Sequence, residues 1–523
     1  MKSPTRTSRT RLRALDPRRS RADSHILLTI CEGLAGLGAV SVLCAIAGSL
    51  DDAGDSVVLG LAGVLLITLG AVARVKLKRR RRPTTAAVLS GLAATWVALV
   101  VAATAVYLSS GAIGRADDAL VEAAAGFSTT ALTTLDPSEL SVPMSLWRAC
   151  TQWLGGLVGI LIGVVALPMA LQGQRLTPTE WSDDDATFAR GRIARRRQVM
   201  AIYLGLTAAI GVAFAATGMG AEDSAVHALT TISTGGFSSM PDSFASFGAG
   251  PAAVATVGMI IAGSGYAIIW WAIRGRRSAL TQSIELRIYG AILLFGTLLV
   301  WWCADGLSWN DSLFTTVSAA STTGFAVADW TALDDAVTAL LLVIIATGSM
   351  IGSAGAGLGV SRARILVAFA RRELRRQLDP GSVVVLKTGG QAVGDPAIER
   401  ITGHQIAHFA TCAGAAGLLA SAGVDLLGAI YTGVSVVSTH GPGIGVGSFG
   451  SLENLSRPAR LLLVPFMSAG RLSLVPLMIG IVWIVHAQQG LRRELRALWR
   501  VWPERLASFS LAARRALSGQ GKK

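Results

Sequence analysis

Long apolar runs alternate with short polar segments along the whole chain. A helix needs roughly 20 apolar residues to cross about 30 Å of hydrocarbon. The pattern predicts ten membrane spans, at residues 26–48, 56–75, 84–108, 145–171, 198–217, 251–273, 284–304, 336–358, 402–422 and 459–486. The predicted fold is therefore an all-α integral membrane protein.

Four external segments between these spans carry a second pattern. Each holds an apolar stretch of about ten residues, which is too short to span a bilayer, and then a run of Ser, Thr and Gly. The runs are GFSTTALT (126–133), ISTGGFS (232–238), ASTTGFA (320–326) and VSTHGPG (437–443). Their recurrence indicates an internal repeat of span, short re-entrant helix, loop and span.

The repeat predicts four membrane-pore-membrane units around one central pore, preceded by a two-helix hairpin without such a loop. The expected divisions are a basic cytoplasmic N-terminus (1–24), the hairpin (25–83), pore repeats at 84–172, 173–274 and 275–360, a cytoplasmic linker (361–401), the fourth repeat (402–487) and a basic amphipathic cytoplasmic tail (488–523).

Composition and charge support a membrane protein. Apolar residues make up 52% of the chain and charged residues 15%, with a net charge of +15. The Arg and Lys clusters fall in alternate short loops, which indicates topology and not a nucleic-acid surface. We expect a multi-pass plasma-membrane protein with both termini in the cytoplasm. The five Cys form no CxxC pair, so a disulfide framework or a zinc site is not expected.

Four irregular loops at membrane depth point to an ion pathway. Backbone that is not helical is tolerated there only where protein or water covers it. Four loops around one axis cover one another, and their carbonyls can replace the hydration shell of a cation. Gly provides backbone conformations that a Cβ disfavours, and Thr hydroxyls can add oxygen ligands.

Acidic residues stand near the start of each short helix: Asp118, Glu222, Asp223, Asp311 and Asp425. Acids suit a helix N-terminus, where the helix dipole is positive. They would also raise the cation concentration at the pore mouth. Both roles, helix cap and cation attraction, are compatible with the sequence.

With these motifs in order, the chain resembles the Trk/Ktr/HKT superfamily of potassium transporters, and within it the pore subunit of bacterial Trk systems. The resemblance covers roughly residues 84–486. It rests on QWLGG (152–156), STGGFS (233–238), TTGFA (322–326) and GPGIG (441–445). It implies potassium uptake by a homodimer within membrane lipid, regulated by a cytosolic nucleotide-binding subunit. K⁺ is then the transported ion, with no cofactor in this chain.

Alignment of the loops with the family's selectivity filter identifies the expected ion-binding residues. They are Thr129, Thr130, Ala131, Ser233, Thr234, Gly235, Thr322, Thr323, Gly324, Thr439, His440 and Gly441. In this alignment Ala131, Gly235, Gly324 and Gly441 stand at the filter glycine position. Ala131 departs from the family pattern, which leaves open a Na⁺-permeable or weakly selective pathway.

His440 is a second departure, since the family usually has Asn or a small residue there. A protonated His440 would repel cations, so a pH effect on flux is one hypothesis. The alternative is a neutral side chain that is hydrogen-bonded behind the filter.

The resemblance also implies a gate below the filter. The Gly-rich stretch 348–359 matches an intramembrane loop of the family, with Gly352, Ser353, Gly355 and Gly357 as gate residues. Arg471 lies inside the last span, where a charge is functional by default. It matches the family's gate arginine.

Three other interpretations remain open. A polytopic membrane enzyme would need converging nucleophiles, carboxylates or metal ligands, and the spans contain almost no acids. A coupled secondary transporter predicts two inverted halves instead of four similar units. His404 and His408 have a spacing that could bind a metal, but no third ligand is evident, so we expect polar interface residues.

Overall fold

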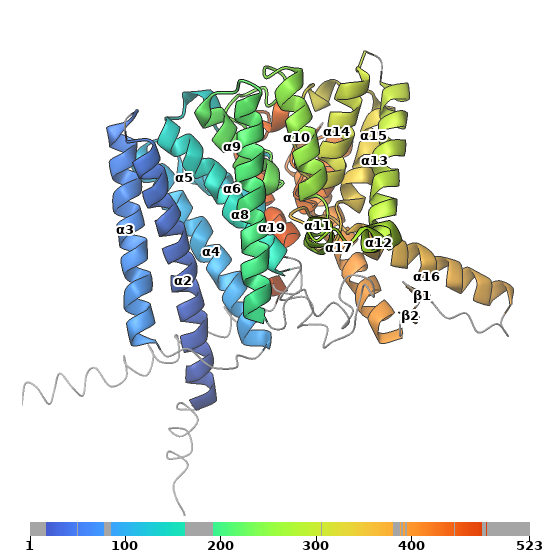
Figure 1. Cartoon of the computed structure of the whole chain (residues 1–523), viewed down its shortest axis with the longest axis horizontal. Helices are drawn as coiled ribbons and strands as arrows, with labels where there is room; N and C mark the ends of the chain where they lie inside the picture. The colour runs from blue at the N-terminus through green and yellow to red at the C-terminus, as the bar shows by residue number, and fades with distance from the viewer. Residues whose placement is uncertain are drawn as a thin grey trace, which may run out of the picture.

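The computed structural model describes residues 17–49, 51–77, 85–162, 192–304, 306–379, 387–388, 391–392, 395–443, 445–472 and 477–478. These residues form a bundle of helices with irregular loops between them (Figure 1). The predicted tail (488–523) and the end of the predicted span 145–171 lie outside the described residues.

The elements before residue 280 include the N-terminal hairpin and the first two short helices. They are α2 (Pro17–Ala47), α3 (Ala53–Lys76), α4 (Thr85–Ser110), α5 (Ala116–Ser128), η1 (Pro137–Glu139), α6 (Val142–Leu161), α8 (Arg192–Ala216), α9 (Ala221–Ile232), α10 (Ala249–Ala262), α11 (Tyr266–Ile273) and α12 (Arg277–Gln282).

The later elements include the third and fourth short helices and one two-stranded ladder of four residues. They are α13 (Ile284–Cys303), α14 (Trp309–Ser321), η3 (Trp330–Ala332), α15 (Asp335–Thr347), α16 (Val360–Leu378), β1 (Lys387–Thr388), β2 (Gln391–Ala392), α17 (Asp395–Ser421), α18 (Leu426–Val437), η4 (Ser448–Gly450) and α19 (Arg457–Leu472).

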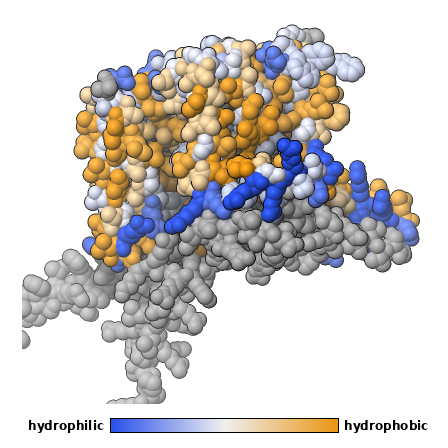
Figure 2. All heavy atoms as spheres, viewed as in Figure 1, coloured by the Kyte–Doolittle hydropathy of each residue, from blue (hydrophilic) through white to orange (hydrophobic). Residues whose placement is uncertain are grey.

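Length and composition identify the membrane-crossing helices. Within the described ranges, five helices are long and apolar enough to cross a bilayer: α2 from Ile26, α3, α4 from Ala87, α8 from Arg197 and α13. Together α10 and α11 qualify as one bent span. Hydrophobic residues cover the middle of the visible face, and hydrophilic residues follow its lower edge (Figure 2). The chain is an all-α, multi-pass membrane protein.

The predicted span at 251–273 is not a straight helix. α10 stops at Ala262, α11 begins at Tyr266, and the two axes differ by 105°. The carbonyls freed at the break pair with a distant irregular segment, because the amides of Met350 and Ala354 donate to Gly263 O and Ala262 O, each at 3.1 Å. The apolar run therefore encodes a helix pair broken at a Gly-Ser-Gly sequence.

The predicted span 336–358 also contains less helix than its apolar length suggests. α15 ends at Thr347, and residues 348–359 follow an irregular path in the structure. The turn begins at Gly348, whose φ of +68° is unfavourable for residues with a side chain. α16 then leaves the side of the bundle (Figure 1).

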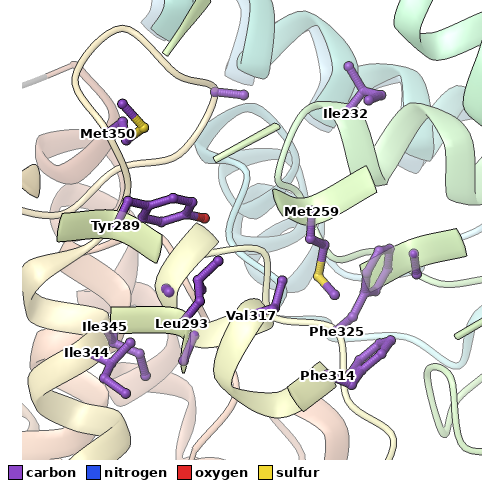
Figure 3. Close-up of a cluster of buried hydrophobic side chains, with 14 of the residues drawn as sticks. Ile232, Met259, Tyr289, Leu293, Phe314, Val317, Phe325, Ile344, Ile345 and Met350 are labelled. Carbon is purple, nitrogen blue, oxygen red and sulfur yellow. The ribbon is translucent and has the colours of Figure 1, made fainter. Parts of the chain in front are cut away.

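The two largest hydrophobic clusters pack around the short helices. In one, Met259 of α10 lies among Phe314 and Val317 of α14 and Phe325 of the loop that follows, while Leu293 of α13 lies near Ile345 of α15 (Figure 3). The other joins α2, α4, α5 and α6 to α19. Burial of short helices at the centre, with longer helices outside, keeps the irregular loops away from lipid.

The hairpin of α2 and α3 packs closely at two glycines. A Cβ atom at Gly38 would lie 2.6 Å from Gly63 O and 2.9 Å from the Cβ of Leu66, whereas a Cβ at Gly36 would meet no atom within 4 Å. Two helix backbones can approach this closely only when small residues face one another.

We therefore expect Gly38→Val to lower the free energy of unfolding by about 1–3 kcal/mol, the usual cost of overpacking. Thermal unfolding of the purified protein in detergent measures the change. Gly36→Val is the matched control, since its side chain would extend into open space. Equal melting temperatures for the two variants would contradict the packing described here.

Candidate functional site

Each of the four short helices ends in the same backbone conformation. The residue after the first serine of each run is a threonine with positive φ: Thr129 (55°), Thr234 (52°), Thr322 (59°) and Thr439 (57°). A β-branched residue in this region is strained and persists only where its surroundings hold it. Fourfold repetition of one strained threonine indicates four equivalent sites.

Hydrogen bonds establish which residues are equivalent. After each threonine, the next amide donates to the carbonyl five residues earlier in the short helix. The four bonds are Thr130 N to Ala125 O (3.0 Å), Gly235 N to Thr230 O (2.7 Å), Thr323 N to Ser318 O (3.0 Å) and His440 N to Ser435 O (2.8 Å).

This register corrects the predicted alignment of the second loop by one residue. Gly236, and not Gly235, stands at the position of Gly324 and Gly441. The φ angles agree, with 78° at Gly236, 85° at Gly324 and 108° at Gly441, whereas Gly235 has no positive φ. Adjacent glycines hid the shift, although the serine before each threonine (Ser128, Ser233, Ser321 and Ser438) gives the same register.

The four loops meet at these positions. A Cβ atom at Gly236 would lie 2.1 Å from Thr323 O, and one at Gly324 would lie 2.3 Å from His440 O. Ala131 N donates to His440 O at 3.1 Å. The loops of the second, third, fourth and first repeats are therefore in contact in that order.

Ala131 brings the one side chain at the glycine level of this ring. A Cβ at Gly236 or at Gly324 would lie 2.6 Å from the Ala131 methyl carbon, and a Cβ at Gly441 would lie 2.7 Å from the Ala131 backbone. The ring therefore has room for one methyl group and not for a second one beside it.

The threonine hydroxyls differ in their partners, although all four side chains are fully buried. Thr234 donates to Ser233 O at 2.7 Å, and Thr322 accepts a hydrogen bond from Ala356 N at 3.0 Å. Among the described residues, the hydroxyls of Thr129 and Thr439 have no hydrogen-bond partner. These two buried oxygens could act as ligands for a cation.

The irregular segment 348–359 lies against the third loop. Besides the bond from Ala356 N to Thr322, a Cβ at Gly355 would lie 2.4 Å from Ser321 O. Gly352 O accepts a hydrogen bond from Tyr266 N at 3.0 Å, and the hydroxyls of Ser353 and Ser349 are 2.8 Å apart. Gly357 has a φ of 84°. The segment is thus held between the break in α10–α11 and the third loop.

Arg471 of α19 joins this segment to α6. Its Nη1 donates to Ala354 O at 2.7 Å, and its Nε and Nη2 donate to Gly155 O at 3.1 and 3.0 Å. A Cβ at Gly159 would lie 2.5 Å from the guanidinium carbon. Glycine at that position therefore leaves the space that the buried arginine fills.

Residues 56–303 and 282–489 match the model of the family TrkH, described as cation transport protein. The chain belongs to the TrkH family.

Proteins similar in sequence to this TrkH-family chain carry names of the same family. The Trk system potassium uptake protein TrkI of Halomonas elongata is 29% identical over 376 residues, which cover 69% of this chain and 76% of that protein. The Trk system potassium uptake protein TrkH of Escherichia coli K12 is 28% identical over 380 residues, 69% of this chain and 78% of that protein.

Among solved structures, the crystal structure of the potassium transporter TrkH from Vibrio parahaemolyticus has a TM-score of 0.77 against this chain. The sequence identity is 23%, and the match covers 88% of this chain and 98% of that one. The two proteins share their fold. Membership of a family of cation transport proteins favours transport over the membrane-enzyme interpretation.

The predicted acids lie at or near the starts of the short helices and make local contacts. Asp425 accepts a hydrogen bond from Gly428 N at 2.9 Å, Asp311 one from Ser308 at 2.7 Å, and Asp223 one from Ser239 at 2.6 Å. Asp118 pairs with Arg460 at 3.0 Å, and Glu222 lies in the first turn of α9. The cap role is therefore present in part.

His440 is fully buried in the fourth loop, at the position of Thr130 and Thr323. Its ring packs edge-on against Trp330, with 4.6 Å between the ring centroids. Neither ring nitrogen has a hydrogen-bond partner in the described part of the chain. The expected hydrogen bond behind the filter is therefore not found, and an aromatic contact takes its place.

Three residues with direct contacts to the loops carried no predicted role. Gln152 of α6 donates to Gly235 O at 2.7 Å and accepts from Phe237 N at 3.0 Å. Glu122 and Arg148 form a buried ion pair beside the first two loops. Gln152 stands in the QWLGG motif, and the opposite charges inside apolar segments were a signal for the other two.

The two candidate registers of the second loop predict different results for alanine substitutions. We expect Gly236→Ala to abolish cation flux, because the left-handed backbone costs a side-chain residue ~1–2 kcal/mol and the methyl would meet Thr323 O. Gly235→Ala should reduce flux less, since Gly235 has no positive φ and its methyl would meet the side chain of Gln152 instead of a neighbouring loop backbone. Rb⁺ uptake into proteoliposomes measures both. A larger loss for Gly235→Ala would restore the original alignment.

Proposed function

We propose that this chain is the ion-conducting subunit of a potassium-uptake system. The observation that supports this most is the contact of four loops, each entered through a strained threonine and meeting at Ala131, Gly236, Gly324 and Gly441. The relatives are named as potassium uptake proteins of Trk systems.

Ten spans would complete the architecture. The hairpin is α2–α3, and the four units are α4–α5–α6, α8–α9 with α10–α11, α13–α14–α15 and α17–α18–α19. In each unit the short helix stands between two outer helices, as a membrane-pore-membrane repeat requires. The proposed unit boundaries are the divisions that the sequence predicts.

Orientation follows from charge. Basic residues lie near the end of α3 (Lys76), near the start of α8 (Arg197) and directly after α11 (Arg274). The short helices are connected to the opposite ends of the spans. Basic residues flanking spans face the cytoplasm. Both termini would then be cytoplasmic, and the acids of the short helices would face the outside, where they attract cations.

In the filter, backbone carbonyls and the free hydroxyls of Thr129 and Thr439 would replace water around a dehydrated K⁺. Thr130, Ser233, Gly235 and Thr323, which the sequence also predicts as ion-binding residues, line the same turns, with Gly236 added by the corrected register. Because these carbonyl and hydroxyl ligands carry no net charge, they would bind a cation weakly enough for it to enter and leave.

A sodium-permeable pathway is the second candidate. The observation that favours it is the methyl of Ala131, which occupies space between Gly236 and Gly324. A side chain at one of four positions changes the size of the ring and the direction of one carbonyl, and both affect the choice between K⁺ and Na⁺.

We expect Ala131→Gly to raise the K⁺/Na⁺ permeability ratio by about tenfold, which corresponds to ~1.4 kcal/mol of differential stabilisation. Flux of each ion into proteoliposomes gives the ratio. An unchanged ratio that already favours K⁺ would show that three glycines suffice, and the sodium alternative would be rejected.

The segment 348–359 and Arg471 would form the gate. Arg471 holds Ala354 O on one side and Gly155 O on the other. A fixed positive charge at this depth also repels cations. Opening would require Arg471 to release at least one of these carbonyls.

We expect Arg471→Ala to raise K⁺ leak through the isolated chain at least about tenfold, because each lost hydrogen bond from a charged group contributes roughly 1.5–3 kcal/mol to the closed state. Proteoliposome flux without added partner measures the leak. The control is Arg457→Ala, an exposed arginine near the start of the same helix. No rise in leak would exclude Arg471 from the gate.

Regulation would come from outside this chain. The names of the relatives refer to Trk systems, which fits further components. We propose a homodimer bound to a cytosolic nucleotide-binding subunit. Nucleotide would act on that partner, and K⁺ would be the transported ion.

A further inference from the structure

A buried ion pair lies beside the filter loops. Glu122 is in α5 and Arg148 is in α6, and Arg148 Nε donates to Glu122 Oε1 at 2.7 Å. The exposed fractions of the two side chains are 0% for Glu122 and 4% for Arg148. Buried charges need partners on all sides, so their remaining contacts show what the pair holds.

Glu122 binds the segment that leaves the first filter loop. Its Oε2 accepts the amide of Thr134 at 2.8 Å and the hydroxyl of Thr134 at 3.2 Å. The hydroxyl of Thr133 lies 3.2 Å from both carboxylate oxygens. Only Leu132 separates this pair of threonines from Ala131 in the ring.

Arg148 binds the corresponding segment of the second loop. Its Nη1 donates to Ser238 O at 3.1 Å, and its guanidinium carbon lies 3.6 Å from the centroid of the Phe237 ring. Phe237 follows Gly236 directly. One ion pair therefore spans the exits of two neighbouring loops.

The first loop passes this restraint on to the fourth repeat. Thr133 N donates to Gly450 O at 3.1 Å, and Thr133 O accepts from Leu452 N at 2.9 Å. A Cβ at Gly450 would lie 2.3 Å from Ala131 O. A displacement of Thr133 would therefore move Ala131 both through the chain, by way of Leu132, and through the contact with Gly450.

We infer that the ion pair Glu122–Arg148 is a selectivity-determining clamp, which sets the distance between the first and second filter loops. This inference rests on the proposed function, since it concerns the same pore. Charge-assisted hydrogen bonds are shorter and stronger than neutral ones, and each partner here holds the backbone of a different loop. The carbonyl oxygens of the first and second loops then cannot move independently to fit a smaller or larger ion, so the pore discriminates between ions by size.

Stability alone does not explain such a pair. Replacement of a buried ion pair by packed apolar residues is often neutral or stabilising, whereas loss of one partner is strongly destabilising. This difference separates a positioning role from a structural one. The double variant Glu122→Leu/Arg148→Met removes both charges and leaves no unpaired one, but it also removes the bonds to Thr134 and Ser238.

The experiment compares the full wild-type chain with three variants of it. Thermal unfolding in a buffer that contains a large organic cation, in place of K⁺ and Na⁺, reports folding. The flux of K⁺ and of Na⁺ into proteoliposomes reports selectivity. We expect the double variant to unfold near the wild-type temperature, while its K⁺/Na⁺ permeability ratio changes at least about tenfold, as the loss of a buried hydrogen bond allows.

Arg148→Lys is the second variant, in case the double variant does not fold. It keeps the charge opposite Glu122, but one ammonium group cannot replace the planar fork that also reaches Ser238. We expect a smaller change of the ratio in the same direction. Trp147→Phe is the control on the same helix, because Trp147 donates to Ser41 of α2, away from the loops.

The outcomes separate the two proposals. A double variant or an Arg148→Lys variant that folds and keeps the wild-type ratio would overturn the clamp and leave the transport function intact. Wild-type protein that moves neither K⁺ nor Na⁺ would overturn the proposed function, and the clamp with it. A ratio that changes equally in Trp147→Phe would assign the effect to general disturbance of α6 and overturn the clamp.

Discussion

Backbone groups that leave a helix inside a bilayer need new partners, and this requirement shapes the centre of the molecule. Water is absent there, so every freed amide or carbonyl costs several kcal/mol if it stays unpaired. The break between α10 and α11 frees carbonyls that bind amides of the segment 348–359. That segment in turn binds Thr322 and Arg471. Each irregular region therefore depends on another one, and none could form alone.

α6 is the element that connects these regions. Arg148, Gln152, Gly155 and Gly159 follow one another at intervals of three or four residues and share one face of the helix. In that order they contact the loop exits, the second filter loop, and then the guanidinium of Arg471. A rotation or shift of this one helix would displace the contacts of the second loop and the contacts of Arg471 together. The hydrogen bonds thus provide a physical route between these two regions.

Hydropathy and repeat spacing predicted much of this fold, because span length and the Ser/Thr/Gly runs depend on local composition. The short helices start and end near the expected residues, from Ala116–Ser128 to Leu426–Val437. The bend at Gly263 was missed because both halves of the pair are apolar, and periodicity does not reveal a change of direction. The shift from Gly235 to Gly236 was missed because two adjacent glycines fit either register. Backbone φ angles and hydrogen bonds, which depend on the neighbouring loops, distinguish the two.

Four units within one chain can diverge independently, and the four loops that meet at Ala131 show the consequence. In a pore made of four identical subunits, one methyl at the glycine position would be four methyls, and the distances around Ala131 leave room for one. His440 is a similar case, because its ring packs on Trp330 of the neighbouring repeat, while Thr130 and Thr323 occupy the equivalent positions. The clamp from Glu122 to Arg148 also acts on two loops only. The four loops are therefore unequal in their contacts, and a substitution in one loop must be judged by the partners of that loop.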